Sequence, residues 1–260
     1  MPWRSPLNAE IYDRFVREGS VYGWLNRRLV KLADLAAAPR ILDLACGTGA
    51  TTIACLHAMG ARAEIVAIDS SEAMVEVARA NILDPRARFE VLAAAEADRL
   101  EGDFPRVVCC AAFWQFPSAA AVFRALARRT RPGARLVFNV PAERVEGEPA
   151  PVHAIQAALT EAIAAESGHA FEALPTLVDP ASLRSEAADH GFEPAGTRRL
   201  VYEGRQGELV ELMSIPAMIG PITADLDRAG RDRVLERVAG RVDPSVVVEV
   251  PWIYFTFVRR

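Results

Sequence analysis

Short apolar runs alternate with amphipathic stretches through the first half of the chain. The apolar runs predict strands at 40–45, 63–68, 87–92, 106–111 and 134–140. The stretches between them predict helices at 50–59 and 71–83, a short one near Glu96, and another at 119–130. Strands this apolar need cover on both faces, as in a parallel sheet with helices on either side. The alternation therefore predicts an α/β fold with a doubly wound sheet.

The second half of the chain is less regular. The pattern predicts a helix at 152–167, a helix capped by Asp179 that ends at Gly191, a strand at 193–202, a helical stretch at 207–241 broken near Pro216 and Pro221, and a last strand at 245–258. Pro251 in that last strand favours an edge position or a bulge. Without an internal repeat or a low-complexity linker, one domain with insertions is the expected organisation.

Composition narrows the classes of function. The chain has 260 residues, 51% of them hydrophobic and 25% charged, and a formal net charge of -4. A net negative charge of this kind does not favour binding to the phosphate backbone of nucleic acid. Cysteines without a CxxC pair and scattered histidines predict no metal site. The longest uninterrupted apolar run, Val107 to Trp114, is too short to cross a bilayer. We expect a cytoplasmic protein, a monomer or homodimer, without a nucleic-acid or membrane partner.

The stretch "ILDLACGTGA" places Gly47 and Gly49 directly after an apolar strand. Glycines there allow a sharp turn and a close approach of the backbone to a ligand. The helix that follows offers free N–H groups to the same space. Thr52 stands where a dinucleotide fingerprint needs a third glycine, and the Gly-Lys-Ser/Thr of a P-loop is absent. The turn therefore gives only weak support for phosphate binding.

Asp69 ends the next predicted strand, in "EIVAIDSS". Neighbouring parallel strands end at the same crevice, so Asp69 is expected to lie close to the glycine turn. A carboxylate there accepts hydrogen bonds from a ribose diol and repels a phosphate on that ribose. The combination favours a ribonucleoside ligand without phosphates. The alternative for Asp69 alone is a helix-capping acid.

Three motifs carry a resemblance to a known family: "ILDLACGTG", "VAIDSSEAM" and "LARRTRPGARLVFNVP". Over roughly 37–141 the sequence resembles the class I S-adenosylmethionine-dependent methyltransferases, of the small-molecule tailoring type. The resemblance implies a seven-stranded, mostly parallel Rossmann-like sheet, S-adenosylmethionine as cofactor and S-adenosylhomocysteine as product. It also implies a single domain over 1–260, with an N-terminal helical lid at 1–36, a cofactor-binding core at 37–141 and cap insertions at 142–178 and 206–242.

The same resemblance implies the cofactor contacts. Asp43 is expected to face the methionine amino group, Asp69 the ribose, and Met74 the adenine. The full expected cofactor-binding set is Tyr12, Asp43, Ala45, Cys46, Gly47, Gly49, Asp69, Ser70, Met74, Ala95, Glu96 and Ala111. Ala94 replaces an acid that relatives often carry, so Ala95 or Glu96 is expected to meet adenine instead. Arg106 stands where relatives usually open the fourth strand with Asp.

The acceptor is expected beyond the fourth strand, at "CAAFWQF". The expected substrate-binding residues are Tyr22, Trp24, Trp114, Gln115, Phe116, Met213 and Met218, with packing in the core as the alternative for the aromatic and Met positions; Phe113 is expected to be core. His153 is the first candidate for a general base, since histidine titrates near neutrality; an exposed helix start is its alternative. Tyr22 is the second candidate.

We expect methyl transfer to a small-molecule acceptor, with O-methylation in bacterial secondary or cofactor metabolism as the first choice. The alternatives are N- or C-methylation, and a cyclase or decarboxylase that binds the cofactor without transferring its methyl group. A non-enzymatic interaction subunit is a third class, which the intact Gly47, Gly49 and Asp69 argue against. The Asn/Asp-Pro-Pro-Tyr motif typical of enzymes that methylate amino groups of DNA or protein is absent.

Overall fold

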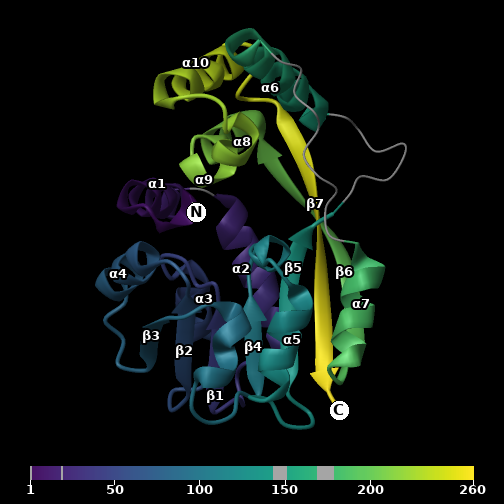
Figure 1. The fold of residues 1–260 in the computed structure, drawn as a ribbon. Coiled ribbons are helices and arrows are strands. Elements are labelled where there is room, and N and C mark those ends of the chain that lie inside the picture. Colours follow the sequence, from purple (N-terminus) through teal and green to yellow (C-terminus); the bar gives the residue numbers. More distant parts are fainter. Residues whose placement is uncertain (1, 19, 143–150, 169–178) are drawn as a thin grey trace.

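A seven-stranded sheet forms the centre of the protein (Figure 1). The computed structural model describes residues 2–18, 20–142, 151–168 and 179–260. The strands are β1 (Arg40–Leu44), β2 (Glu64–Asp69), β3 (Ala87–Val91), β4 (Arg106–Cys109), β5 (Arg135–Pro141), β6 (Phe192–Arg205) and β7 (Val247–Arg259). Their order is β3-β2-β1-β4-β5-β7-β6, with β1 to β5 parallel and β7 antiparallel to both of its neighbours. This confirms the predicted doubly wound, mostly parallel sheet.

Helices cover both faces of this sheet. The described helices of the whole protein are η1 (Pro2–Arg4), α1 (Pro6–Glu18), α2 (Ser20–Ala33), α3 (Ala50–Ala58), α4 (Glu72–Asn81), η2 (Ala94–Arg99), η3 (Phe113–Gln115), α5 (Ala119–Ala127), α6 (Pro151–Ser167), α7 (Pro180–Asp189), α8 (Gln206–Met213), α9 (Pro216–Ile219), η4 (Gly220–Thr223) and α10 (Arg228–Ala239). One face packs against α2, α3 and α4, and the other against η2, α5 and α7.

Adjacent residues along each central strand are buried on opposite faces. On β1, Ile41 packs into the cluster with α2 and α3, whereas Leu42 packs into the cluster with η2 and α5. Side chains alternate between the faces of a strand, so a run without polar positions needs cover on both sides. Phe113 stacks on Phe138 with ring centroids 3.8 Å apart and is buried, as expected for a core residue.

Side-chain caps begin the helices that follow the strands. The Ser71 hydroxyl accepts a hydrogen bond from the Met74 N–H at the start of α4, and Ser118 accepts one from Ala121 at the start of α5. Such caps satisfy N–H groups that have no partner inside the helix. Both caps lie at the carboxyl edge of the sheet.

Pro251 lies inside the sheet, which corrects the expectation of an edge position. It belongs to β7, which runs between β5 and β6. The Pro251 carbonyl accepts the Ala142 N–H at 2.9 Å, so the proline nitrogen also faces the β5 side, where that strand ends. The missing N–H would have met the Ala142 carbonyl, just past the end of β5, so the ladder between β7 and β6 keeps its bonds at this position. The register shift of this region falls in β6, between Pro194 and Gly196.

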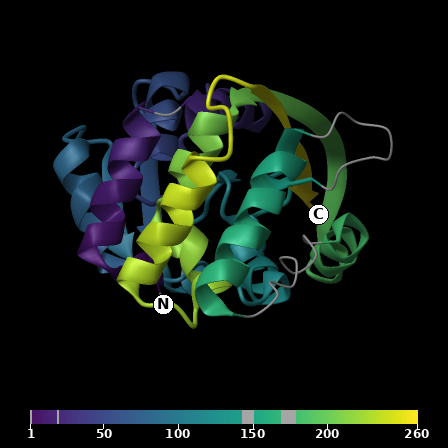
Figure 2. The same ribbon diagram turned by 90° about the horizontal axis from the view of Figure 1, so that it is seen from above.

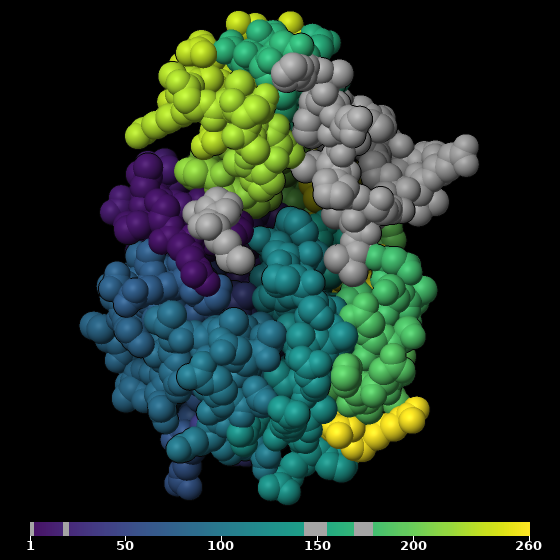
Figure 3. All heavy atoms as spheres, viewed as in Figure 1, coloured from purple at the N-terminus to yellow at the C-terminus, as the bar shows by residue number. Residues whose placement is uncertain are grey.

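The hairpin of β6 and β7 extends past the end of β5 and carries a layer of helices (Figure 1). We call α6, α8, α9, η4 and α10 the cap. Its own apolar cluster consists of Ile155, Ala158, Leu159, Ala162, Ile163, Ile219, Val234, Val238 and Val242. Seen from above, α10 lies between α1 and α6 (Figure 2). In the space-filling view the purple atoms of the N-terminal helices lie between the sheet domain and the yellow-green atoms of the cap (Figure 3).

Among the described residues, no helix has the length and apolar character needed to cross a membrane.

Candidate active site

A cavity of about 470 Å³ opens at the carboxyl ends of β1, β2 and β4. This is the edge of an open α/β sheet where ligands bind as a rule. Its lining residues are Trp3, Arg4, Tyr12, Tyr22, Ala45, Gly47, Asp69, Ser70, Met74, Leu92, Ala93, Ala94, Ala95, Cys110, Ala111, Ala112, Gln115, Phe116, Pro117, Ser118, Ala121 and Val122. Every described lining residue thus comes from the first 122 positions, and none comes from the cap.

The glycine turn forms the floor of the cavity. Gly47 and Gly49 have φ values of 55° and 98°, in the left-handed region that favours glycine. A Cβ at Gly47 would lie 3.2 Å from Cε1 of Tyr12, and one at Gly49 would lie 2.5 Å from Cδ1 of Ile82. Both positions therefore favour glycine for their conformation, and a Cβ at Gly49 would also require the Ile82 side chain to shift.

Two alanines adopt the same left-handed conformation at the ends of neighbouring strands. Ala45 follows β1 and Ala111 follows β4, and each has a φ of 53°. This conformation is uncommon for a residue with a side chain and is found preferentially at functional sites. Both alanines line the cavity, and their small side chains keep its floor open. The turn at Ala111 also explains why β4 ends at Cys109, two residues before the predicted end.

Asp69 is held at the end of β2 by backbone N–H groups. Its Oδ2 accepts the Gly47 N–H at 3.0 Å, and its Oδ1 accepts the Ser71 N–H at 2.9 Å. Burial raises the pKa of this carboxyl, and the backbone hydrogen bonds lower it in part. Each carboxylate oxygen has a further lone pair, so both can still accept a hydrogen bond from a ligand. The glycine turn and the acid are thus one unit, and Ser71 provides the side-chain cap of α4.

Asp43 lies behind the cavity wall, outside the residues that line it. The side chain is completely buried, and its Oδ2 accepts a hydrogen bond from the Thr52 hydroxyl at 2.7 Å. Its Oδ1 has no partner among the described residues. Burial raises the pKa of Asp43 to about 7. Thr52, which replaces the third glycine of a dinucleotide fingerprint, therefore has a role as the partner of this acid.

Aromatic side chains from the N-terminal helices cover the cavity. The ring of Tyr12 packs edge-on against Trp3 and against Tyr22, with centroids 5.6 Å apart in each pair. Burial raises the pKa of both tyrosines above their ordinary value. Both hydroxyls are therefore protonated at neutral pH and serve as hydrogen-bond donors rather than bases.

The expected cofactor residues divide into two groups in the structure. Tyr12, Ala45, Gly47, Asp69, Ser70, Met74, Ala95 and Ala111 line the cavity, whereas Asp43, Cys46, Gly49 and Glu96 lie outside its lining. Glu96 pairs with Arg99 at 3.0 Å, with half of its side chain exposed. Ala93 to Ala95 form a wall of small residues, and Ala94 stands at the position where relatives often carry an acid.

The expected acceptor residues are more dispersed. Tyr22, Gln115 and Phe116 line the cavity. Trp114 turns away: its Nε1 donates to the Ala111 carbonyl at 3.2 Å, and its ring borders a second cavity of about 330 Å³ beside α7. Trp24 packs against Tyr202 and carries the Arg28 guanidinium 3.7 Å above its ring.

Three more candidates lie in or next to the cap. Met213 packs against the cap cluster, and Met218 packs against the core cluster next to the N-terminal helices. His153 falls in the first turn of α6, and its side chain lies outside the described residues. Its role as a base stays a prediction. No group of three metal-ligating side chains is found in the described part of the chain.

Sequence reasoning missed several lining residues. Trp3 and Arg4 belong to η1, which no motif marks, and they reach the cavity because the Ser71 hydroxyl donates to the Trp3 carbonyl at 2.8 Å. Pro117 and Ser118 follow directly after the expected aromatic segment. The helix predicted from residue 119 was the available signal, since a helix that follows β4 begins at the carboxyl edge of the sheet.

Comparison with known proteins finds related sequences for the first half of the chain. A family model described as a methyltransferase domain matches residues 41–133. The chain is 36% identical over 122 residues to the ubiquinone biosynthesis O-methyltransferase of Hahella chejuensis, a match that covers 43% of this chain and 48% of that protein. The matched region thus spans about half the length of this curated relative.

Solved structures share the fold at low sequence identity. The YcgJ protein of Bacillus subtilis superimposes with a TM-score of 0.58 at 15% identity, covering 92% of this chain and 99% of that one. The 4+2 cyclase SpnF superimposes with a TM-score of 0.57 at 18% identity, covering 90% of this chain and 81% of that one. The glycine turn, the sheet order and the methyltransferase domain model matched over residues 41–133 together support a class I S-adenosylmethionine-dependent methyltransferase.

Proposed function

We propose that this protein transfers the methyl group of S-adenosylmethionine to an oxygen of a small-molecule acceptor. The observation that carries the proposal is the unit of Gly47 and Asp69. The carboxylate of Asp69 lines the cavity and is fixed by the Gly47 N–H. An oxygen that can accept hydrogen bonds from a diol therefore lies next to a backbone segment that a ligand can approach closely. This pairing suits a ribose joined to a compact chain, which is the chemistry of the proposed cofactor.

The residues present fit this cofactor. Gly47 leaves a space beside Tyr12 that a Cβ would fill, and the walls at Ala45 and Ala111 carry only methyl groups. We assign the methionine moiety to these three residues, the ribose to Asp69, and the adenine to Met74 and the wall at 93–95. When bound, S-adenosylmethionine supplies a methyl group that its sulfonium already makes electrophilic.

The protein's own task is then to orient the acceptor and exclude water. Orientation alone contributes on the order of 7–11 kcal/mol to such a reaction. We place the acceptor next to Ala111, between Tyr22 on one side and Gln115 and Phe116 on the other, because these residues line the same cavity. Tyr22 donates a hydrogen bond in its neutral form, and Gln115 offers an amide for orientation.

The described lining favours an acceptor that loses its proton readily. Asp69 is the one carboxylate in that lining, and its oxygens already accept two backbone N–H groups. The neutral tyrosines are poor bases at neutral pH. A phenol or a carboxylic acid therefore suits the site better than an aliphatic alcohol, with His153 as the proposed base. The name of the relative from Hahella chejuensis, an O-methyltransferase of ubiquinone biosynthesis, points to oxygen as the acceptor atom.

The test is a methyl-transfer assay with the purified chain. The protein is incubated with S-adenosylmethionine and a panel of phenols, carboxylic acids and amines, and S-adenosylhomocysteine is measured together with the methylated product. O-methylated product from a phenol or acid supports the proposal, and methylated amine or carbon corrects the acceptor atom. An acceptor that is converted without S-adenosylhomocysteine, in a reaction that still needs the cofactor, identifies the cyclase or decarboxylase alternative. Absence of cofactor binding by calorimetry contradicts the proposal as a whole.

A further inference from the structure

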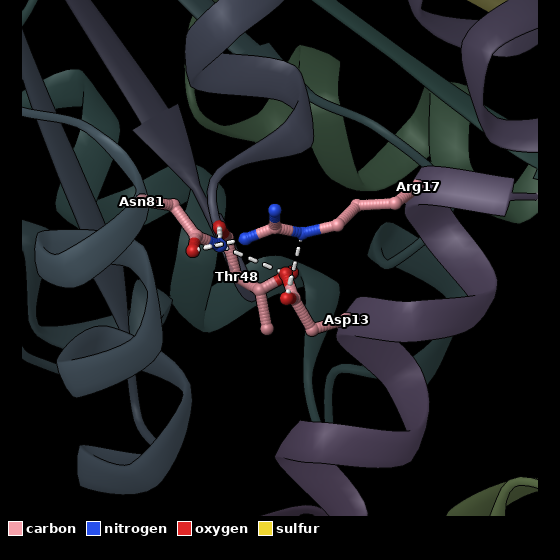
Figure 4. Close-up of polar contacts among 4 residues, drawn as sticks. All are labelled: Asp13, Arg17, Thr48 and Asn81. Atoms are coloured by element: carbon pink, nitrogen blue, oxygen red, sulfur yellow. Dashed lines mark hydrogen bonds and ion pairs between the residues drawn. The ribbon is translucent and has the colours of Figure 1, made fainter.

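Four residues connect the N-terminal helix to the glycine turn (Figure 4). The Asn81 side chain amide, at the end of α4, donates to Oδ1 of Asp13 at 2.8 Å and to the Thr48 carbonyl at 3.2 Å. The Asn81 Oδ1 accepts from the Arg17 guanidinium, which also donates to Oδ2 of Asp13 at 2.8 Å. Both N–H groups and the oxygen of the Asn81 amide are therefore used. We call this set of contacts the latch.

The latch ends on the glycine turn itself. Thr48 stands between Gly47 and Gly49 and is almost completely buried. The same end of α4 supports the loop by packing, because Ile82 and Ala78 lie within contact distance of the Cβ position of Gly49. The carboxyl end of α4 thus holds the glycine turn by both a hydrogen bond and close packing.

On the α1 side, the latch controls the position of Tyr12. Tyr12 is the neighbour of Asp13 on α1, and its ring contacts the space above Gly47 while lining the cavity. A displacement of Asp13 from Asn81 moves Tyr12 with it, since both belong to one rigid helix turn. The contact between Asn81 and Asp13 therefore keeps the cavity covered.

A second polar contact joins α1 to the cap. Asn8, completely buried, accepts the Ala217 N–H of α9 at 2.9 Å, which ties α1 to the cap. On the latch side, the side chains of Asp13 and Arg17 are 17% and 61% exposed. Water can replace the partners of exposed groups at small cost, whereas a buried polar group loses its only partner. Of these two polar contacts of α1, the latch is therefore the one that water replaces at lower cost.

We infer that Asn81 is a positioning residue for cofactor binding: it latches α1 to the Thr48 carbonyl and so sets the rate at which the lid opens over the glycine turn. The inference rests on the proposed function for the identity of the ligand. The structural part, the hold of Asn81 on α1, is independent of that identity.

The first experiment compares release of S-adenosylhomocysteine from the wild-type chain and from Asn81→Ala, followed by stopped-flow tryptophan fluorescence, since Trp3 lines the cavity. Losing a hydrogen bond to a charged group is expected to speed release roughly 5- to 20-fold. Hydrogen–deuterium exchange in α1 of the ligand-free protein should rise as well. Asp84→Ala is the control, because Asp84 follows α4 but pairs only with Arg86, and it should leave both measurements at the wild-type value.

A second pair of variants separates the latch from a merely structural role. Asn81→Asp places a carboxylate against Asp13 and should speed release more than Asn81→Ala. Adding Asp13→Asn to this variant exchanges the two side chains, so that position 13 now carries the amide donor and position 81 the carboxylate. The double variant should therefore release the ligand more slowly than Asn81→Asp alone. Asp13→Asn by itself, at a partly exposed position, provides a variant of the latch if the Asn81 variants do not fold.

The results separate the two proposals. A wild-type chain that binds no cofactor contradicts the proposed function. In that case hydrogen–deuterium exchange in α1 of Asn81→Ala still tests whether Asn81 holds this helix. A wild-type rate of release and wild-type exchange in Asn81→Ala would overturn the latch alone. A lower melting temperature with unchanged release would also overturn it, because Asn81 would then be structural only.

Discussion

The hydroxyl of Thr52 donates a hydrogen bond to the carboxyl of Asp43 at 2.7 Å, and both side chains are completely buried. Asp43 belongs to β1 and Thr52 to α3, so the contact fixes the helix to the strand directly below the glycine turn. The second oxygen of Asp43 has no partner among the described residues. A buried acid with one free oxygen pays a desolvation cost when it ionises, and this gives the protein a dependence on pH.

Asp43→Asn should reduce the dependence of stability on pH. Burial raises the pKa of Asp43 from 3.8 to about 7, so between these values the folded chain keeps a proton that the unfolded chain releases. The contribution of this group to the free energy of unfolding therefore falls as pH rises through that window. Urea unfolding from pH 5 to pH 8 should show that the free energy of unfolding of Asp43→Asn increases relative to that of the wild type as pH rises. A constant difference between the two proteins across this range would contradict the assignment.

Asp69→Ala should weaken binding of S-adenosylmethionine at least about tenfold, since the variant removes the proposed ribose acceptor and frees the Gly47 and Ser71 N–H groups. Calorimetry measures the affinity directly. Asp69→Asn is the matched variant, because it keeps one acceptor oxygen and should lie between Ala and the wild type. Equal affinity in all three proteins would remove Asp69 from the site.

Phe116→Ala should raise the KM for the acceptor while leaving the affinity for the cofactor within about twofold, because Phe116 borders the proposed acceptor region. Trp114→Ala is the comparison within the same segment. Its ring borders the second cavity, so it should lower the melting temperature more than it changes the KM. Steady-state kinetics with the first acceptor identified will measure the KM of both variants. A larger rise in KM for Trp114→Ala than for Phe116→Ala would contradict this assignment of the two residues.

Gly49→Ala should destabilise the protein by more than Gly133→Ala. Both glycines have positive φ values, 98° and 87°, so both substitutions carry a backbone cost of about 1 kcal/mol. A Cβ at Gly49 would also lie 2.5 Å from Cδ1 of Ile82, whereas a Cβ at Gly133 would meet nothing within 4 Å. Denaturant unfolding of the two variants isolates the packing of α4 against the glycine turn. Equal losses would show that Ile82 moves aside freely.

The order of strands and helices could be predicted from the sequence because it depends on local chemistry. Apolar runs, the cap at Asp179 and breaks near Pro216 and Pro221 act within a few residues, and the structure confirms each of them. The crevice at Gly47 and Asp69 followed from the same information, since parallel strands end at a common edge. Pro251 was misplaced because the position of a strand in the sheet depends on its partners.

The sequence by itself determined the family, the sheet and the glycine turn with its acid. Only the tertiary structure decided what surrounds that turn: Trp3, Tyr12 and Phe116 line the cavity, Trp114 does not, and Asn81 donates a hydrogen bond to Asp13. The physical reason is distance along the chain. Asp13 and Asn81 are 68 positions apart, and no local pattern records a contact that forms only when separate helices pack against the same loop.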